Sequence, residues 1–259
     1  MEDYKFSSGS PRHGQMDIKG RFALREFSEV FNVRNSEGLP YVLIGGQAVN
    51  YWAERYFQSE SELKALQPFT SEDIDFKGGK LDVKRIAEQL KLTEVYPSKV
   101  AMTALAGCVP FQIGDLKSNI EIVRTVPGIS GSIDALAIEA ELGSKIIRVL
   151  DPISLLACKL DLVATISQEH RRDLEHIQIL VPCVRAFLRE FLQQVEQNEL
   201  PARGWLGAAN RVLKLTTSSR SRKIARRADI EWSEILPLQE IDRSKHKKII
   251  RFREYYLRH

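Results

Sequence analysis

The sequence lacks any long apolar segment and is poor in cysteine. No stretch approaches the roughly 18 uninterrupted apolar residues that a membrane-spanning helix requires, and the first ten residues contain no apolar signal region. The three cysteines, Cys108, Cys158 and Cys183, are widely spaced and odd in number, which argues against a disulfide or zinc framework. We therefore expect a cytoplasmic protein with reduced thiols and no membrane partner.

Acidic residues are scarce near the C-terminus. The chain of 259 residues has a net charge of +4. Residues 201–259 contain 15 Lys and Arg but 6 Asp and Glu, a net charge of +9, so the first 200 residues carry −5. This asymmetry points to a polyanionic partner for the C-terminal part. Hydrophobic content of 43% is sufficient for one large folded domain or two small ones.

A glycine pair follows a short apolar run near residue 41. Tyr41 to Ile44 has the character of a buried strand, Gly45 and Gly46 allow a sharp turn, and apolar residues then recur at helical spacing. A glycine turn that opens a helix predicts an anion site, because its free N–H groups and the helix dipole point the same way. Taken alone, such a glycine pair is more often only a turn.

Two aspartates separated by one residue come later in the chain. On a strand, Asp73 and Asp75 project from the same face while Ile74 points to the core. Two neighbouring carboxylates repel each other and need a cation, and hard oxygen ligands suit Mg²⁺ or Mn²⁺. The alternative is an ordinary surface strand end. Residues 58–70, between the two motifs, are expected to form an inserted loop or short helix.

Together these motifs resemble the polymerase-β-type nucleotidyltransferases. The segment Ser71-Glu-Asp-Ile-Asp-Phe76 is similar to the AbiEii-type toxin branch and its MenA-like relatives. The resemblance implies a nucleotidyltransferase fold in which Gly45, Gly46 and Gln47 bind the nucleotide and Asp73 and Asp75 bind the metal. The interval between Gly46 and Asp73 is longer than in compact members of the superfamily.

A third acidic residue is a candidate metal ligand. In Asn119–Arg124, Ile120 and Ile122 share one face of a predicted strand and Glu121 stands on the other. The superfamily resemblance implies a third carboxylate in such a setting, although AbiEii-type members need not use one there. The alternative is a solvent-facing glutamate on an edge strand. Asp115 and Asp134 are weaker candidates because both lie beside turns.

A lysine interrupts the apolar stripe of a later helix. Asp151-Pro152 predicts its start, and Lys159 falls on the same face as Leu156 and Val163. A lysine there is costly unless it has a partner, although its amine could also reach solvent at the edge of the stripe. Asp173 heads an inward-facing stripe of the next helix.

This pattern also resembles the AbiEii-type branch. Its lysine-containing helix and the Arg-Asp pair that opens the next helix match Lys159 and Arg172-Asp173, and the resemblance covers about residues 40–180. It implies that Lys159 contacts nucleotide phosphate and that Asp173 is essential to catalysis. The aspartate could hold the lysine in place or act as a base on the attacking hydroxyl.

Two basic clusters occupy the C-terminal region. They span Thr216–Arg227 and Arg243–Arg258, with aromatic residues nearby. Either cluster alone is explained by a solvated helical face. Both together favour an RNA-contacting surface, in which cations hold phosphates and rings stack on unpaired bases. The aromatic candidates are Trp205, Trp232, Tyr255 and Tyr256.

The sequence therefore predicts an α/β protein with a small mixed sheet, helices on one face and a helical C-terminal domain. The predicted parts are a catalytic domain (1–150), a helical domain (151–200) and a basic helical region (201–259). The leading hypothesis is a Mg²⁺-dependent enzyme that moves an NMP from an NTP to an RNA 3′ end, most simply tRNA. It would be the toxin of a toxin–antitoxin or abortive-infection system, with a cognate antitoxin as partner. A protein or small-molecule acceptor, and a non-catalytic RNA- or partner-binding regulator, remain alternatives.

Overall fold

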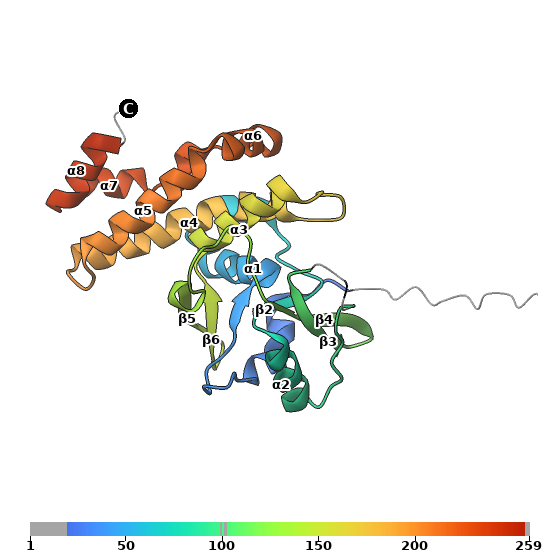
Figure 1. Ribbon diagram of the computed structural model, residues 1–259. Helices are drawn as coiled ribbons and strands as arrows, with labels where there is room; N and C mark the ends of the chain where they lie inside the picture. The colour runs from blue at the N-terminus through green and yellow to red at the C-terminus, as the bar shows by residue number, and fades with distance from the viewer. Residues whose placement is uncertain (1–19, 99, 101–102, 257–259) are drawn as a thin grey trace, which may run out of the picture.

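A six-stranded mixed β-sheet forms the first half of the molecule, and a stack of helices forms the second (Figure 1). The computed structural model describes residues 20–98, 100 and 103–256. The strand order is β3-β4-β2-β1-β6-β5. The chain is thus an α/β protein with a mixed sheet and a helical C-terminal half, as the sequence predicts.

The central strands are short and the outer ones longer. β1 pairs antiparallel with β2 and parallel with β6, and β2 pairs parallel with β4. The outer pairs β3–β4 and β5–β6 are antiparallel hairpins. The strands are β1 (Val42–Ile44), β2 (Ile74–Lys77), β3 (Leu105–Ile113), β4 (Leu116–Val123), β5 (Ala137–Leu142) and β6 (Lys145–Leu150).

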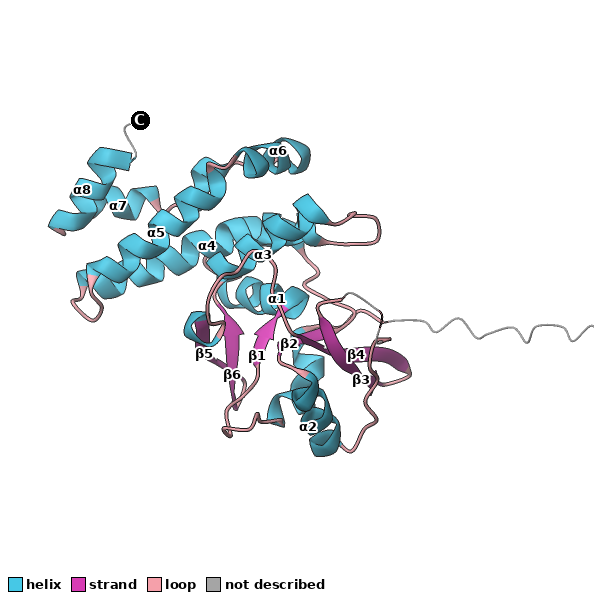
Figure 2. Cartoon of the chain, in the orientation of Figure 1, coloured by secondary structure: helices cyan, strands magenta, loops and turns pink. Residues whose placement is uncertain are grey.

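Helices α1 and α2 lie between strands along the chain, and from α3 to the end of the described chain every element is a helix, joined by loops (Figure 2). The α-helices are α1 (Gly45–Tyr56), α2 (Lys80–Leu90), α3 (Pro152–Thr165), α4 (Asp173–Glu196), α5 (Ala202–Thr216), α6 (Ser219–Ala228), α7 (Leu238–Arg243) and α8 (Lys247–Tyr256). Short 3₁₀ helices are η1 (Leu24–Asn32), η2 (Ser61–Leu66), η3 (Asp134–Leu136) and η4 (Trp232–Ile235). Within the described ranges, no helix is both long enough and apolar enough to cross a membrane.

The two faces of the central strands differ in chemistry. Ile74 and Phe76 of β2 and Ile120 and Ile122 of β4 are buried, and in parallel register they share one face. That face packs against η1, where the rings of Phe31 and Phe76 are 6.2 Å apart. The alternating residues of β2 and β4 therefore project from the opposite face. At β2 and β4, one face thus belongs to the core and the other carries polar side chains, whereas β1 is buried on both faces.

Several predicted elements are confirmed. The strand near residue 41 is β1, the helix after Gly78-Gly79 is α2, and residues 58–70 contain the short helix η2. Asp151 caps α3 as expected, since its Oδ1 accepts a hydrogen bond of 2.9 Å from the Ser154 amide. The three cysteines are free thiols.

Other predicted boundaries were wrong. The apolar segments punctuated by Gly107 and Pro110 predict two short strands, at 101–106 and 109–113. The structure has one strand, β3, which continues through Pro110; residues 101–102 lie outside the described range. Pro110 is tolerated because β3 is an edge strand and needs no N–H on its outer side. The strand predicted at 93–96 is reduced to one bridge between Val95 and Cys108.

The segment 127–143 was predicted to be a loop with a short helix. It contains the short helix η3, but also β5, which pairs with β6 through a two-residue turn. Gly143 adopts φ +59° in this turn, a conformation that glycine accepts readily. The helix predicted over 18–33 is the shorter 3₁₀ helix η1, and residues 18–19 lie outside the described range.

A buried glutamate ties the inserted segment to α4. Glu60, directly before η2, is only 2% exposed. Its carboxylate accepts hydrogen bonds from Arg185 at 2.5 Å and from Arg189 at 2.5 Å, both on α4. Arg185 also bonds Glu62, whose side chain is 49% exposed. The insertion is therefore fixed to the helical half by charge-assisted hydrogen bonds.

We predict that Glu60→Gln lowers the free energy of unfolding by about 1–3 kcal/mol, because it removes the buried acceptor that two arginines share, while Arg185 keeps Glu62 and Arg189 keeps Glu240. Glu62→Gln is the matched control: it removes an exposed partner of the same arginine and should cost under about 1 kcal/mol. Urea unfolding followed by circular dichroism measures both. Equal losses in the two variants would contradict a structural role for the buried pair.

Candidate functional site

A cleft of about 540 Å³ lies over the polar face of β2 and β4. Residues from the β1–α1 turn, the loop before β2, and the strands β2 and β4 line one part of it. Residues of α3 and of the start of α4 line the other part. The cleft thus brings together segments that are far apart in sequence. Of the predicted site residues, it contains Gly45, Gly46, Asp73, Asp75, Glu121, Lys159 and Asp173.

The glycine turn and the aspartate strand are in direct contact. Gly45 has φ +68°, a left-handed conformation that disfavours other residues. A Cβ atom built on Gly45 would lie 1.9 Å from Oδ2 of Asp75, so the position admits no side chain. The backbone of Gly46 hydrogen-bonds the Asp75 carboxyl. The sequence therefore needs glycine at residue 45 both for the turn and for the approach of Asp75.

Strand pairing places the acidic residues side by side. Asp75 is in register with Ile44 on β1 and with Glu121 on β4, and Asp73 directly precedes β2. Burial raises the pKa of Asp75 well above its usual value, and the charges of Asp73 and Glu121 raise it further. The charge of Lys159 and the Gly46 backbone act in the opposite direction. A divalent cation would relieve the repulsion among these carboxylates.

The donor set fits a hard cation that is held jointly with a substrate. Within the described part of the chain, no group of three His, Cys, Asp or Glu side chains is arranged to hold a metal ion alone. Mg²⁺ usually binds to one or two carboxylates and completes its shell with water and phosphate oxygens. Asp73, Asp75 and Glu121 would hold such an ion, since oxygen donors favour Mg²⁺ or Mn²⁺.

The opposite wall of the cleft is cationic. Nζ of Lys159 on α3 lies 2.8 Å from Oδ1 of Asp173, the first residue of α4, and both side chains are buried. Nε of Arg171 donates to the other oxygen, Oδ2, at 2.6 Å. The lysine inside an apolar stripe therefore has a buried partner, rather than reaching solvent at the edge of the stripe.

Its two cationic partners make Asp173 a poor proton acceptor. Burial alone would raise the pKa of Asp173, but Lys159 and Arg171 outweigh this effect and hold the pKa at about 2. Both carboxylate oxygens accept charge-assisted hydrogen bonds. Because a general base works best with a pKa near the ambient pH, the geometry fits the first alternative, in which Asp173 positions Lys159.

Two further residues of the cleft, Ser71 and His176, were not singled out as site residues by the sequence. Ser71 Oγ would lie 2.7 Å, and His176 Cε1 3.3 Å, from a Cβ atom on Gly46, so both flank the glycine turn. His176 is 7% exposed and its Nδ1 has no hydrogen-bond partner among the described residues. Arg172 donates to the backbone oxygen of Thr70 at 2.9 Å, which joins α4 to the loop before Asp73.

The environment of His176 keeps its imidazole ring neutral. Burial lowers the pKa of His176 well below its usual value, and the charge of Lys159 lowers it further. The ring is therefore neutral, so one of its nitrogens can donate a hydrogen bond and the other can accept one. A lone histidine three residues after the Arg-Asp pair carries no sequence signal by itself. Only the fold brings it to Gly46.

Some predicted site residues lie elsewhere. The side chain of Gln47 is buried away from the cleft, where Nε2 donates to the Phe22 carbonyl at 2.9 Å and Oε1 accepts from Asn50 at 3.0 Å. Its predicted contact with nucleotide is therefore corrected to a structural role. Asp115 lies in the β3–β4 turn, and Asp134 pairs with Arg148 at 2.8 Å. Neither of these aspartates lines the cleft.

No family model, curated protein or solved structure matches this chain. The functional argument therefore rests on the residues of the cleft and on their geometry.

We predict that Asp173→Asn lowers the free energy of unfolding at pH 7 by about 3–5 kcal/mol, because it leaves Lys159 buried without a counter-charge. Asp161→Asn on the same helix as Lys159 is the matched control, since its pair with Arg220 is exposed and should contribute under about 1 kcal/mol. Urea unfolding measures both. Equal losses in the two variants would show that burial of the pair is unimportant.

The same pair predicts a dependence on acid. Since the pKa of Asp173 is lowered to about 2, its stabilisation is fully present above the unfolded value of about 3.9 and is lost as pH falls toward 2. The stability difference between wild type and Asp173→Asn should therefore shrink as pH falls from about 4 to about 2. Urea titrations across this range test the expectation, and a constant difference would contradict it.

Proposed function

We propose that this protein is a metal-dependent nucleotidyltransferase, which transfers an NMP from an NTP to an acceptor hydroxyl. The observation that carries the proposal is the contact between Asp75 and the glycine turn, at 1.9 Å from the Cβ position of Gly45. That contact puts a carboxylate beside the turn that opens α1. An anion site and a cation site thus adjoin in one cleft, as an NTP–metal complex requires.

The charge distribution of the cleft supports the same proposal. Carboxylates come from β2, β4 and the loop before β2, whereas Lys159, Arg171 and Arg172 come from α3 and from the start of α4. A metal would bind on the acidic side, and phosphate oxygens could reach from it to the cationic side.

Each residue has a distinct part in the proposed reaction. The Gly46 backbone, which hydrogen-bonds Asp75 in this structure, would bind a phosphate oxygen once Asp75 turns to the metal. Lys159, oriented by Asp173, offsets negative charge that builds up on the phosphates. Mg²⁺ or Mn²⁺, when bound, supplies Lewis-acid activation of the phosphate and of the acceptor hydroxyl. The acceptor oxygen forms a bond to the α-phosphorus as the bond to pyrophosphate breaks. The hydroxyl proton is released to solvent.

The proposed acceptor is an RNA 3′ end, most simply that of tRNA. The support is the basic C-terminal region, with its clusters on α6 and α8. Trp205 must be removed from the predicted stacking residues, because it is fully buried and its Nε1 donates to the Leu188 carbonyl. Trp232 also uses its Nε1 internally, on the Ser221 carbonyl. Tyr255 is 70% exposed.

The motif resemblance extends the proposal to biology. A chain with this segment around Asp73 would act as the toxin of a toxin–antitoxin or abortive-infection pair, held in check by a cognate antitoxin. Its place would be the cytoplasm, where NTPs and RNA are available. The identity of the neighbouring gene and the growth arrest caused by the isolated chain would test this part of the proposal.

A protein or small-molecule acceptor is the main alternative. Deleting residues 201–259 would not separate it from an RNA acceptor, because Trp205 and Phe252 belong to the common core and their rings are 5.4 Å apart. Acceptor screening with the full chain is therefore the appropriate test. Label that enters protein rather than RNA would favour the alternative.

We predict that the purified chain transfers label from at least one α-³²P NTP to total RNA with Mg²⁺, and that EDTA abolishes the transfer. Asp73→Ala and Asp75→Asn should each lower the rate at least about 100-fold, since each removes a ligand for the metal that offsets transition-state charge. Gel autoradiography of the labelled RNA measures the rate.

Asp115→Asn is the matched control, because this aspartate lies in the β3–β4 turn outside the cleft. It should retain the wild-type rate. Undiminished transfer by Asp73→Ala, or transfer that persists in EDTA, would refute the assignment. A chain that binds RNA equally well with and without metal, and transfers no label to any acceptor, would instead be a non-catalytic regulator.

A further inference from the structure

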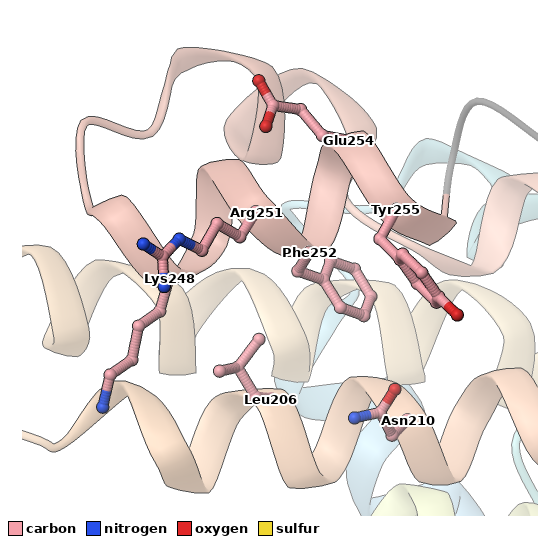
Figure 3. Close-up of a pocket in the computed structure, with 7 residues that line it drawn as sticks. All are labelled: Leu206, Asn210, Lys248, Arg251, Phe252, Glu254 and Tyr255. Carbon is pink, nitrogen blue, oxygen red and sulfur yellow. The ribbon is translucent and has the colours of Figure 1, made fainter.

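A second cavity lies between α5 and α8, outside the candidate active site. Its volume is about 650 Å³. Figure 3 shows its lining, which comes from α5 on one side and α8 on the other. The lining residues are Leu206, Asn210, Lys248, Arg251, Phe252, Glu254 and Tyr255.

The groove has three chemically distinct parts (Figure 3). Lys248 and Arg251 lie at one end, Leu206 and Phe252 face each other across the middle, and Tyr255 and Asn210 lie at the other end. Phe252 is buried and its ring packs on Trp205, so the middle of the groove has a rigid floor. Glu254 points away from α5. The groove is thus cationic at one end, apolar in the middle, and aromatic with an amide at the other end.

We propose that this groove binds one nucleotide unit of a single-stranded RNA. The phosphate lies against Lys248 and Arg251, the base stacks on Tyr255, and the Asn210 amide reaches the base edge. Arginine and lysine bind phosphate oxygens, and a tyrosine ring stacks on any unpaired base. The inference deepens the proposed function, since it rests on RNA as the acceptor and places a contact for it.

Charge and exposure favour this occupant over an apolar peptide. α8 carries Lys247, Lys248, Arg251 and Arg253 against the single acid Glu254. An apolar peptide would bury the two cations at one end of the groove without counter-charges, which is costly. Tyr255 is 70% exposed, so its ring has a surface available for stacking. A duplex would present no unpaired base face to this ring.

The location gives the contact a purpose. α4 and α5 lie between α8 and the sheet that carries the carboxylates (Figure 1). An RNA whose 3′ end enters the cleft must therefore extend across the helical half to reach the groove. The groove would hold an internal part of the RNA, while its 3′ end lies in the cleft and is extended by the reaction.

The first experiment measures stacking. A fluorescein-labelled 12-nucleotide single-stranded RNA of mixed sequence is titrated with the full chain, without NTP or metal, and followed by anisotropy. Tyr255→Ala should weaken binding about 5-fold or more, the range expected for one stacked base. Tyr255→Phe keeps the ring and should bind within about 2-fold of wild type. Unchanged affinity in Tyr255→Ala would overturn the proposal.

The second experiment counts phosphate contacts. The double variant Lys248→Ala/Arg251→Ala should lower the slope of log Kd against log salt by about 1.4, or about 0.7 for each lost contact to a single strand. Lys245→Ala/Lys247→Ala removes two exposed lysines that do not line the groove. This control should leave the slope within about 0.3 of wild type. Equal changes in both variants would reduce the groove to one part of a diffuse basic surface and overturn the proposal.

Competitor ligands show whether the groove binds single-stranded RNA, a duplex or a free nucleotide. Unlabelled single-stranded RNA should displace the probe, whereas a duplex of equal length and free AMP at the same concentration should not. Efficient displacement by AMP would make this a site for free nucleotide, and a Tyr255-dependent dimer in light scattering would make it a chain–chain interface. Either outcome overturns the proposal.

The two proposals can fail separately. The binding assays contain no NTP or metal, so a chain that transfers no label can still show the groove contact. Transfer to RNA by Tyr255→Ala with wild-type affinity would remove the groove and leave the nucleotidyltransferase assignment standing.

Discussion

The organisation of the molecule depends on the close approach of Asp75 to the turn after β1. Antiparallel pairing of β1 with β2 sets Ile44 opposite Asp75, and the missing side chain at Gly45 lets the carboxylate reach the turn. Parallel pairing of β2 with β4 then adds Glu121. Backbone hydrogen bonds of the sheet therefore fix Asp75 and Glu121, whereas Asp73 is placed by the loop before β2.

The helical half supplies the cationic side chains of the cleft. Lys159 is held by Asp173, and Asp173 by Arg171, so a chain of charge-assisted hydrogen bonds runs from α3 to the start of α4. Such buried pairs contribute little net stability, because desolvation offsets the attraction. Their role here is to orient the lysine, because the hydrogen bond to Asp173 fixes the position of the Lys159 amine. The acidic side chains of the cleft thus come from the sheet and the loop before β2, and the cationic side chains come from α3 and the start of α4.

The sequence predicted the parts of this arrangement that depend on local pattern. The glycine turn, the Asp-x-Asp strand and the capped helix of Lys159 each carry a signal within a few residues. It could not reveal Ser71, Arg171 or His176, because their relevance depends on contacts between distant segments. Gln47 shows the opposite failure: a polar residue after a glycine pair looks available, but the fold buries it on Phe22 and Asn50. The prediction for Trp205 failed for the same reason, since only the fold buries its ring against Phe252 and pairs its Nε1 with the Leu188 carbonyl.

The ties between the insertion and α4 have a mechanical consequence. Arg185 and Arg189 donate hydrogen bonds to the Glu60 carboxylate at one end of the segment, and Arg172 donates to the Thr70 carbonyl at the other. The loop that carries Asp73 is thereby hydrogen-bonded to the residue directly before α4, the helix that begins with Asp173. Separation of the acidic and cationic walls would therefore have to break these hydrogen bonds.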